Sequence, residues 1–168
     1  MTRFAADVID AALGIAEGSP LDQLRARRPE ARARTQSSYA VLFNPPDPGG
    51  LSPPERFAVA LRVANLNEAT TVAAHYRARL AGEAGGAALA AAIDAGAPSR
   101  AITPRAQAML RHADLVTTNP SAASALDLEA LSALELSPAE IVTLSQIIAF
   151  VAYQVRVAAS LASIAEVL

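Results

Sequence analysis

The sequence predicts an all-α protein, and three observations lead to that prediction. Hydrophobic residues make up 52% of the 168 residues, whereas aromatic residues make up only 4%. Alanine is abundant throughout, and alanine both favours helices and lets neighbouring helices approach closely. No stretch alternates apolar and polar residues convincingly enough to be a strand. The length fits one domain with a substantial buried core.

The N-terminal part of the chain contains two helix signals. Residues 4–16 carry apolar side chains at helical spacing, and this pattern stops at Gly18. Ser19 is then followed by Pro20 and Asp22, which is the order of a capping residue, a first-turn proline and a first-turn acid. We therefore expect one helix over 4–16 and the start of a second helix directly after Ser19.

A run of arginines follows in the stretch "QLRARRPEARARTQ". These residues are Arg25, Arg27, Arg28, Arg32 and Arg34. A surface for single-stranded nucleic acid would interleave aromatic side chains with the arginines, and this stretch has none. The formal net charge of the whole chain is −2, which argues against broad electrostatic capture of nucleic acid. We expect a solvated helix face or a subunit contact here, and no nucleic-acid partner.

The stretch "NPPDPGG" at 44–50 is the clearest helix breaker and should form an exposed turn. It divides the chain into an N-terminal helical arm, about 1–44, and a helical domain at 51–168. We expect the two parts to form one compact domain overall. Five helical segments are expected after the turn: Pro53 to about Leu80, ended by Gly82; an alanine-rich helix within 85–96; Pro104 to about Val116; about 127–134; and Pro138 to about 166.

A five-residue phrase occurs twice, as "LSPPE" at 51–55 and as "LSPAE" at 136–140. Each phrase is a capping box, in which the serine caps the helix, the glutamate reaches back and a proline occupies a position that needs no amide donor. Apolar positions then match at a constant offset of 85 residues. The matching pairs are Phe57 with Val142, Val59 with Leu144, Val63 with Ile148, Leu66 with Val151, and Val72 with Val157. This correspondence predicts two repeated helical units.

The two repeated segments resemble a known family. The segment "LSPPERFAVALRVANLNEATTVAAHYRARLAG" resembles the core helix of the carboxymuconolactone decarboxylase / alkylhydroperoxidase D-like superfamily. The segment "LSPAEIVTLSQIIAFVAYQVRVAASL" is similar to the last helix of its peroxidase-related branch. The resemblance covers about residues 51–166. It implies an alkylhydroperoxidase D-like multihelical fold with two repeated helical units, assembled as a homo-oligomer.

The peroxidase motif of that family is missing from this chain. Peroxidase members carry a glutamate and then Cys-x-x-Cys-x-x-x-His on the core helix, and the cysteine pair reduces hydroperoxides with the help of a partner reductase. The family glutamate falls on Phe57, the cysteines fall on Ala69 and Val72, and the histidine falls on Tyr76, directly after His75. The whole chain contains no cysteine, so no thiolate is available for this chemistry. Thiol peroxidase activity is therefore not expected.

Three ionisable residues of the same segment are the catalytic candidates. Glu68, His75 and Arg79 are spaced seven and four residues apart, so one helix would place them nearly in line. A carboxylate beside a histidine makes an acid–base pair, and an arginine could hold an anionic substrate. The decarboxylase branch of the family lacks the cysteine pair and uses ionisable side chains around a similar histidine. The alternative is a solvated stripe of Glu68 and Arg79 with His75 at an interface.

The closing helix supplies candidate ligand-binding residues. Gln146, Tyr153 and Arg156 share one face of an otherwise apolar helix. They could line a ligand pocket between the repeats, with Arg156 anchoring an anion. The alternative is that they connect helices or subunits, with the arginine paired to a carboxylate such as Glu140 or Glu55.

The remaining polar residues do not predict a metal or cofactor site. His112, next to Asp114, is expected at the surface or at a helix end. The two histidines, at 75 and 112, are far apart and no acids cluster around them at ligand spacing, so no metal is expected. The glycines of "GEAGG" lack the flanking strand and lysine of a phosphate-binding loop, so no cofactor is expected either.

The chain has no clear targeting or membrane segment. Asp7 and Asp10 interrupt the N-terminal apolar pattern, and the apolar run "IIAFVAY" at 147–153 is too short to cross a bilayer. We therefore expect a soluble cytoplasmic protein with no membrane partner.

The function that these observations favour is that of a cysteine-less, non-peroxidatic family member. It would bind a small molecule or have an accessory role to an oxidative-stress or catabolic enzyme. One alternative is an acid–base enzyme, like a decarboxylase or isomerase, that uses His75 on a small anionic or lactone substrate. Another alternative is a structural subunit of a catalytic relative. The expected partners are further copies of the chain and a related alkylhydroperoxidase-like protein.

Overall fold

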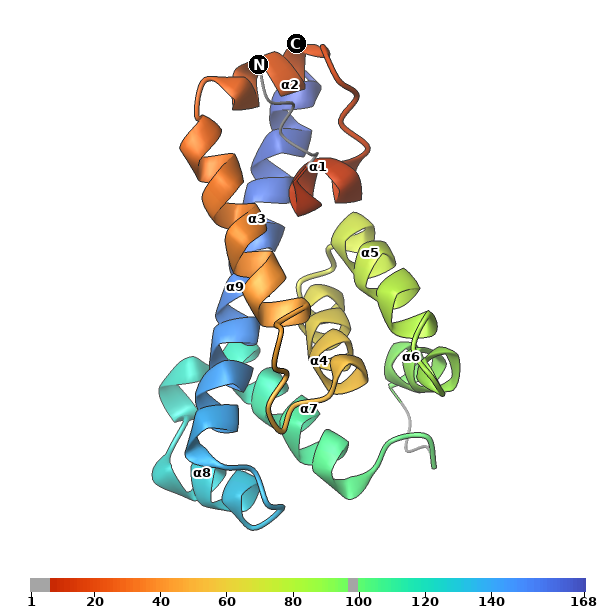
Figure 1. The fold of residues 1–168 in the computed structure, drawn as a ribbon, viewed down its shortest axis with the longest axis vertical. Helices are drawn as coiled ribbons and strands as arrows, with labels where there is room; N and C mark the ends of the chain where they lie inside the picture. The colour runs from red at the N-terminus through yellow and green to blue at the C-terminus, as the bar shows by residue number, and fades with distance from the viewer. Residues whose placement is uncertain (1–6, 97–99) are drawn as a thin grey trace.

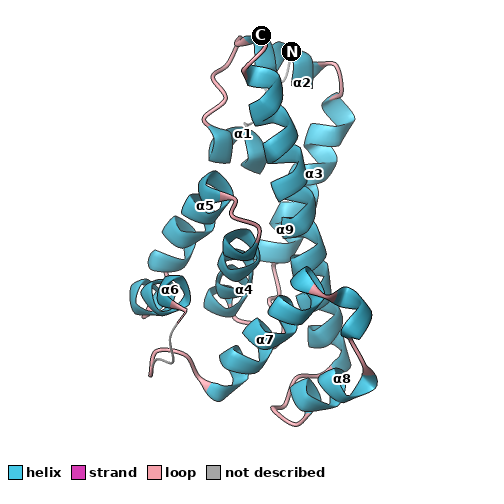
Figure 2. Cartoon of the chain, turned by 180° about the vertical axis from the view of Figure 1, so that it is seen from behind, coloured by secondary structure: helices cyan, strands magenta, loops and turns pink. Residues whose placement is uncertain are grey.

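The computed structural model describes residues 7–96 and 100–168, and these residues form helices joined by short loops, with no strand among them (Figures 1 and 2). The helices are α1 (Val8–Leu13), α2 (Pro20–Ala26), α3 (Pro29–Phe43), α4 (Pro53–Leu66), α5 (Thr70–Ala81), α6 (Gly86–Ala95), α7 (Pro104–Thr118), the 3₁₀ turn η1 (Pro120–Ala122), α8 (Ala125–Ser132) and α9 (Pro138–Ala165). The predicted all-α class is therefore confirmed.

Helix α4 lies at the centre of the fold and α9 runs along the long axis of the molecule (Figure 1). Helix α4 contacts α3, α5, α6, α7 and α9, and its residues from Phe57 to Leu61 are all buried. Helix α9 contributes Leu144, Ile147 and Val151 to the same core, each with no exposed surface. Burial of these two apolar faces against each other is the main source of stability in such a helical core.

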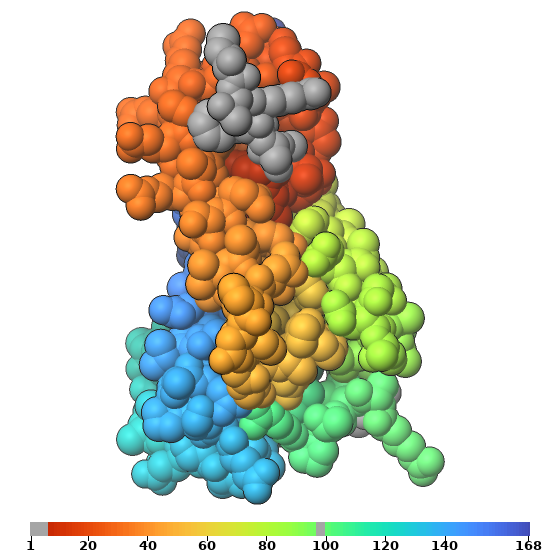
Figure 3. Space-filling model, in the orientation of Figure 1, coloured from red at the N-terminus to blue at the C-terminus, as the bar shows by residue number. Residues whose placement is uncertain are grey.

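The three arm helices pack onto the distal half of α9, and α1 also contacts α5 (Figure 1). In Figure 3 the arm, coloured red to orange, lies at one end of the molecule. Ion pairs connect the arm helices to one another. Arg25 donates to Asp7 at 2.7 Å and also to Asp10, and Arg32 donates to Asp22 at 2.6 Å. Two of the five arginines in the stretch "QLRARRPEARARTQ" thus have internal partners, because Asp7, Asp10 and Asp22 face them.

The exposed turn expected at 44–50 is present, and one buried arginine holds it against the core. The guanidinium of Arg56 donates to the carbonyl oxygens of Leu51 at 2.9 Å, Leu42 at 2.7 Å and Pro48 at 2.6 Å. Three carbonyl acceptors compensate the buried charge for its lost hydration. The end of α3, the turn and the start of α4 are therefore fixed together.

The two capping boxes start α4 and α9 as predicted. The Ser52 amide donates to Glu55 Oε2 at 2.8 Å, and the Ser137 amide donates to Glu140 Oε2 at 2.7 Å. Arg105, in the first turn of α7, donates to the second oxygen of both glutamates, at 3.0 Å and 2.6 Å. One arginine thus connects the starts of the two predicted repeats.

The single long helix expected from Pro53 to about Leu80 is wrong, because the chain folds there as two helices, α4 and α5. Glu68 adopts a left-handed backbone conformation with φ of +54°. The amide of Glu68 donates to the Asn65 carbonyl, and the amide of Ala69 donates to the Ala64 carbonyl, both at 3.0 Å. These two bonds form a Schellman motif, which ends a helix and redirects the chain.

Two further helix boundaries differ from the sequence-based expectation. Helix α1 ends at Gly14, where φ is +63°, rather than continuing to residue 16, and the expected helical residues 4–6 lie outside the described residues. Helix α8 begins at Ala125, two residues before the expected 127, because Ser124 and Asp127 form a third capping box. The other boundaries after residue 85 agree with the expectation to within about two residues.

Among the described helices, α9 is long and apolar enough to cross a membrane by length and composition alone. Its packing is that of a core helix. It contacts α1, α2, α3, α4, α5, α7 and α8, and it carries the buried Gln154 within its apolar face. One such helix is weak evidence for a membrane span, because a helix in the core of a helical protein passes the same test.

Candidate functional site

The four positions onto which the resemblance maps the redox motif, Phe57, Ala69, Val72 and Tyr76, lie at or near the centre of the fold and carry apolar or aromatic side chains. Phe57 on α4 is 1% exposed, and Val72 and Tyr76 on α5 are 3% and 0% exposed. Ala69 is the N-cap residue of α5 and is half-buried. Three of the four positions are thus closed to solvent, and only the first cysteine position reaches the surface.

Phe43, the last residue of α3, occupies the space between these positions. Its ring centroid lies 5.4 Å from that of Phe57, with the two rings nearly parallel, and 5.1 Å from that of Tyr76. The rings of Tyr39 and Phe150 lie 4.9 Å and 6.3 Å from Phe43. Pairs of this geometry stabilise a core beyond their area of burial. A residue of the arm therefore completes an aromatic cluster where family members carry their redox motif.

The polar end of this cluster is a hydrogen bond that the sequence did not predict. The hydroxyl of Tyr76 donates to Gln154 Oε1, and both side chains are buried. Burial raises the pKa of the Tyr76 phenol well above its ordinary value. The sequence did contain a sign that Gln154 is buried, because it shares the apolar face of α9 with Val151, Val155 and Ala158. Gln146 and Tyr153 do not lie on that face.

His75 is half-buried and its partner is a phenol. The Nε2 atom of His75 lies 3.1 Å from the Tyr39 hydroxyl. Burial lowers the pKa of His75 below its ordinary value, and the charge of Arg79 lowers it further. Burial likewise raises the pKa of Tyr39. The pair is therefore neutral near pH 7, and no carboxylate within the described residues bonds to the imidazole.

The structure does not bring the predicted trio together. Arg79 is exposed, lies over the Phe57 ring with its Cζ atom 5.1 Å from the centroid, and donates to Asn44 at 3.3 Å. It is close enough to His75 for its charge to act on the imidazole. Glu68 lies before the first turn of α5, on the loop from α4, and its exposed side chain borders a separate surface depression.

This depression, which we call the α5 hollow, lies where α4, α5 and α6 meet and has a volume of about 520 Å³. The residues that define it are Asn65, Glu68, Ala69, Thr70, Arg77 and Asp94. Arg77 donates to Asp94 at 2.6 Å and 2.9 Å, and these bonds hold the pKa of the Asp94 carboxyl below its ordinary value. Ala69, the accessible motif position, thus forms part of a polar depression.

The start of α5 at this hollow has no side-chain cap. Ala69 has no side-chain oxygen, and the first helical bond runs from the Ala73 amide to the Ala69 carbonyl at 2.8 Å. The amides of Thr71 and Val72 precede that bond, so they belong to the group of first-turn donors that needs an outside acceptor. The hollow, whose lining includes Ala69 and Thr70, therefore lies beside the positive end of a helix dipole.

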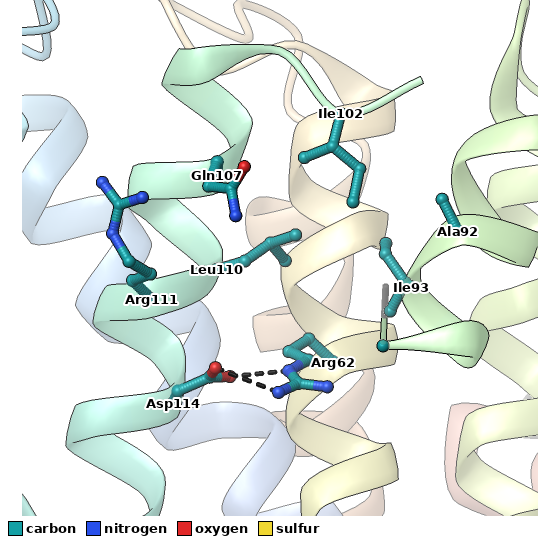
Figure 4. Close-up of a pocket in the computed structure, with 9 residues that line it drawn as sticks. Arg62, Ala92, Ile93, Ile102, Gln107, Leu110, Arg111 and Asp114 are labelled. Atoms are coloured by element: carbon teal, nitrogen blue, oxygen red, sulfur yellow. Dashed lines mark hydrogen bonds and ion pairs between the residues drawn. The ribbon is translucent and has the colours of Figure 1, made fainter. Parts of the chain in front are cut away.

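A smaller depression of about 170 Å³ adjoins the hollow, between α4, α6 and α7 (Figure 4). Arg62 and Ile93 line both spaces. Figure 4 shows Arg62 facing Asp114, to which it donates at 2.6 Å and 3.0 Å. This bidentate pair neutralises Arg62, whereas Arg111 of the smaller depression and Glu68 of the hollow have no ion pair within the described residues.

The three candidates on α9 lie on its exposed side. Tyr153 is 42% exposed and its hydroxyl lies 2.9 Å from the Thr35 hydroxyl of α3. Arg156 donates to the Ala152 carbonyl at 2.9 Å, on its own helix, whereas Glu55 and Glu140 bond to Arg105. Gln146 borders a groove of about 420 Å³ between α3 and α9. Tyr153 thus connects two helices, and Arg156 remains exposed.

The expectation of a surface position for His112 is wrong. His112 is only 7% exposed, because α8 covers it on α7, while its neighbour Asp114 pairs with Arg62. Within residues 7–96 and 100–168, no group of three or more histidine, aspartate or glutamate side chains could hold a metal ion.

Among solved structures, the chain is similar to the crystal structure of an uncharacterized peroxidase-related protein from Silicibacter sp. TM1040. The TM-score is 0.70, the sequence identity is 23%, and the match covers 84% of this chain and 73% of that chain. No protein-family model and no curated protein matches the chain. The chain therefore has the multihelical fold of a peroxidase-related protein, and the likeness extends to the fold alone.

Proposed function

We propose that the chain is a non-peroxidatic protein of the alkylhydroperoxidase D-like fold that binds a small molecule in the α5 hollow. The ligand class is a small lactone or carboxylate, which presents an oxygen acceptor to the start of α5. The observation that carries the proposal is the position of Ala69. It is the one motif position that is open, and it forms the wall of a hollow of about 520 Å³.

Loss of the redox chemistry follows from the residues themselves. No cysteine is present in the chain, and hydroperoxide reduction by the family mechanism requires a thiolate. The second cysteine position is the buried Val72, inside the cluster around Phe43. A hydroperoxide would therefore find neither a nucleophile nor space at that position.

The chemistry of the hollow favours an acceptor oxygen. It lies beside the start of α5, where the positive end of the helix dipole favours a carbonyl or carboxylate oxygen. Arg77 is already bonded to Asp94, so it would orient a ligand rather than supply a full positive charge. The volume of the hollow lies within the range usual for small-molecule sites.

Binding is favoured over acid–base catalysis because of the surroundings of His75. A general base needs a partner that orients it and access to the substrate. The partner here is the Tyr39 phenol, and Glu68 borders the hollow, which His75 does not line. The functional residues of the hollow are therefore distinct from the histidine.

We further propose that the protein forms a homo-oligomer through the face shared by α3 and α9. Val41 and Val142 are 64% and 57% exposed on these helices, and Gln146, Ala149 and Phe150 border the groove between them. Exposed apolar surface of this kind favours association with another surface of the same character.

The binding proposal is tested by isothermal titration with δ-valerolactone and benzoate as probes. The wild-type protein should bind at least one of them saturably. Ala69→Phe, which fills the hollow, should weaken that binding at least tenfold. Ala78→Phe is the control, because Ala78 is exposed on α5 and does not line the hollow. Absence of saturable binding to both probes, or equal binding by the Ala69→Phe variant, would show that the hollow is not the site.

A further inference from the structure

A further pocket lies between α7 and α8, away from the α5 hollow, and has a volume of about 270 Å³. Leu115 and Leu131 form part of its apolar wall, and Arg111, His112 and Asp127 are its polar residues. Helix α8 is held over α7 by few elements, since it contacts only α7 and α9. The pocket is therefore a defined space with its own polar groups, separate from the α5 hollow.

His112 is the residue that marks this pocket as a binding site. Its side chain is more than nine-tenths buried, and its Nδ1 atom has no hydrogen-bond partner within the described residues. Buried polar atoms are nearly always bonded, because leaving one unpaired loses the hydration free energy of that atom without compensation. A leucine would fill the same space without that loss. The Nδ1 atom is closed to solvent and the ring as a whole makes no hydrogen bond within the described residues, so the edge of the imidazole that lines the pocket is available to a ligand.

The charges beside His112 balance each other. The guanidinium of Arg111 makes no ion pair or side-chain hydrogen bond with any part of the chain that the structure describes. Asp127 accepts bonds from the Ser124 amide and hydroxyl, both at 2.8 Å and both through Oδ2, so its other oxygen can accept a further bond. One free cation and one free carboxylate oxygen favour a ligand without net charge.

We propose that this pocket binds an uncharged, partly apolar small molecule that carries a hydrogen-bond donor beside an acceptor, such as a short branched-chain amide. The carbonyl oxygen accepts from Arg111 or from the imidazole of His112. The amide nitrogen donates to Asp127 or to the unprotonated imidazole nitrogen. The alkyl group packs between Leu115 and Leu131. This site goes beyond the proposed function, and it does not depend on the α5 hollow.

The experiment is an NMR titration of the ¹⁵N-labelled full chain with three probes of one carbon skeleton: isobutyramide, isobutyrate and isobutylamine. The chain has two histidines, so the imidazole signals of His112 and His75 are separable by substitution. Isobutyramide should shift the His112 ring nitrogens saturably and leave those of His75 unchanged. The two charged probes should bind at least tenfold more weakly. Tighter binding of either charged probe, or a pocket that takes up only water, would overturn the proposal.

Two substitutions separate binding from folding. His112→Leu should abolish the saturable shifts of nearby amides and leave the melting temperature of the free protein equal or higher, because the unpaired nitrogen is gone. His75→Leu is the matched control and should bind isobutyramide as the wild type does. Arg111→Met, at an exposed position, should fold normally and weaken binding at least fivefold. Unchanged binding in both the His112→Leu and Arg111→Met variants would contradict the assignment.

Discussion

At the residue scale, Tyr76 is a buried phenol whose hydroxyl donates to Gln154 in the middle of the core. The family resemblance places the motif histidine at this position, and the sequence could not indicate that Phe43 would fill the space beside it. That contact joins residues that are distant in the chain, and nothing in the local sequence around Phe43 specifies it.

Removal of one partner of the buried Tyr76–Gln154 hydrogen bond should lower the free energy of unfolding more than removal of both partners. Tyr76→Phe leaves the Gln154 amide unpaired, and we expect the free energy of unfolding to fall by about 1–3 kcal/mol. The double variant Tyr76→Phe with Gln154→Leu should recover part of that loss, since no polar atom is then left unpaired. Urea denaturation of the wild type, the two single variants and the double variant measures the coupling. Strict additivity of the two single substitutions would show that the bond contributes no coupling.

The two histidines should make the stability depend on pH below neutrality. Burial lowers the pKa of both His75 and His112 below the ordinary value of 6.5, so the folded chain binds fewer protons than the unfolded chain. The stability is then fully present above about pH 6.5 and falls as the pH drops toward 5. Carboxyls such as Asp94, whose pKa lies below an ordinary 3.8, contribute only at lower pH.

Urea denaturation at pH 7, 6 and 5 tests this dependence. The His112→Leu variant should lose less stability than the wild type between pH 7 and pH 5. Adding His75→Leu should remove most of the remaining pH dependence. A stability that rises between pH 7 and 5 would mean that the folded chain favours the charged imidazoles, contrary to the burial of both rings.

At the element scale, the helix starts were predictable because their signals are local. Serine, proline and glutamate within four residues specify the starts of α4 and α9, and both boxes form. The break between α4 and α5 was not predictable in this way. It depends on a left-handed glutamate, Glu68, and the residues on either side of it continue the apolar helical pattern. Sequence rules assign such a position to glycine or asparagine.

The left-handed backbone at Glu68 predicts that Glu68→Gly will stabilise the protein. Glycine adopts φ near +54° without the strain that a side chain causes there, and we expect a gain of up to about 1 kcal/mol. Glu129→Gly is the matched control, because Glu129 is exposed within α8. That variant should lose about 0.5–1 kcal/mol. Urea denaturation measures both, and a loss at Glu68 equal to that at Glu129 would contradict the prediction.

At the scale of the whole molecule, the sequence predicted the fold class and the exposed turn at 44–50. The contacts of the arm could not be predicted from the sequence, because they join α1 to α5 and α3 to α9, which are far apart in the chain. The face between α3 and α9 exists only in the folded molecule. For the candidates on α9 the sequence therefore left open a ligand pocket or a connection between helices or subunits, whereas the structure places them on the exposed side of α9, with Tyr153 bonded to Thr35.

This face predicts the assembly state. The wild-type protein should be larger than a monomer in light scattering coupled to size-exclusion chromatography. Val142→Asp should raise the dissociation constant at least tenfold, because a carboxylate would then be buried in an apolar contact. Leu126→Asp is the control, since Leu126 is 72% exposed on α8, away from the groove. A wild-type monomer at all concentrations, or dissociation by both substitutions alike, would exclude this face as the interface.

Hydroperoxide turnover is the most direct test of the central claim, that the fold works here without thiol redox chemistry. The purified protein is incubated with cumene hydroperoxide and a dithiol reductant, and peroxide consumption is followed against a thiol peroxidase as the positive control. The account predicts consumption equal to the protein-free background at every protein concentration. Consumption that rises in proportion to the amount of protein would contradict it.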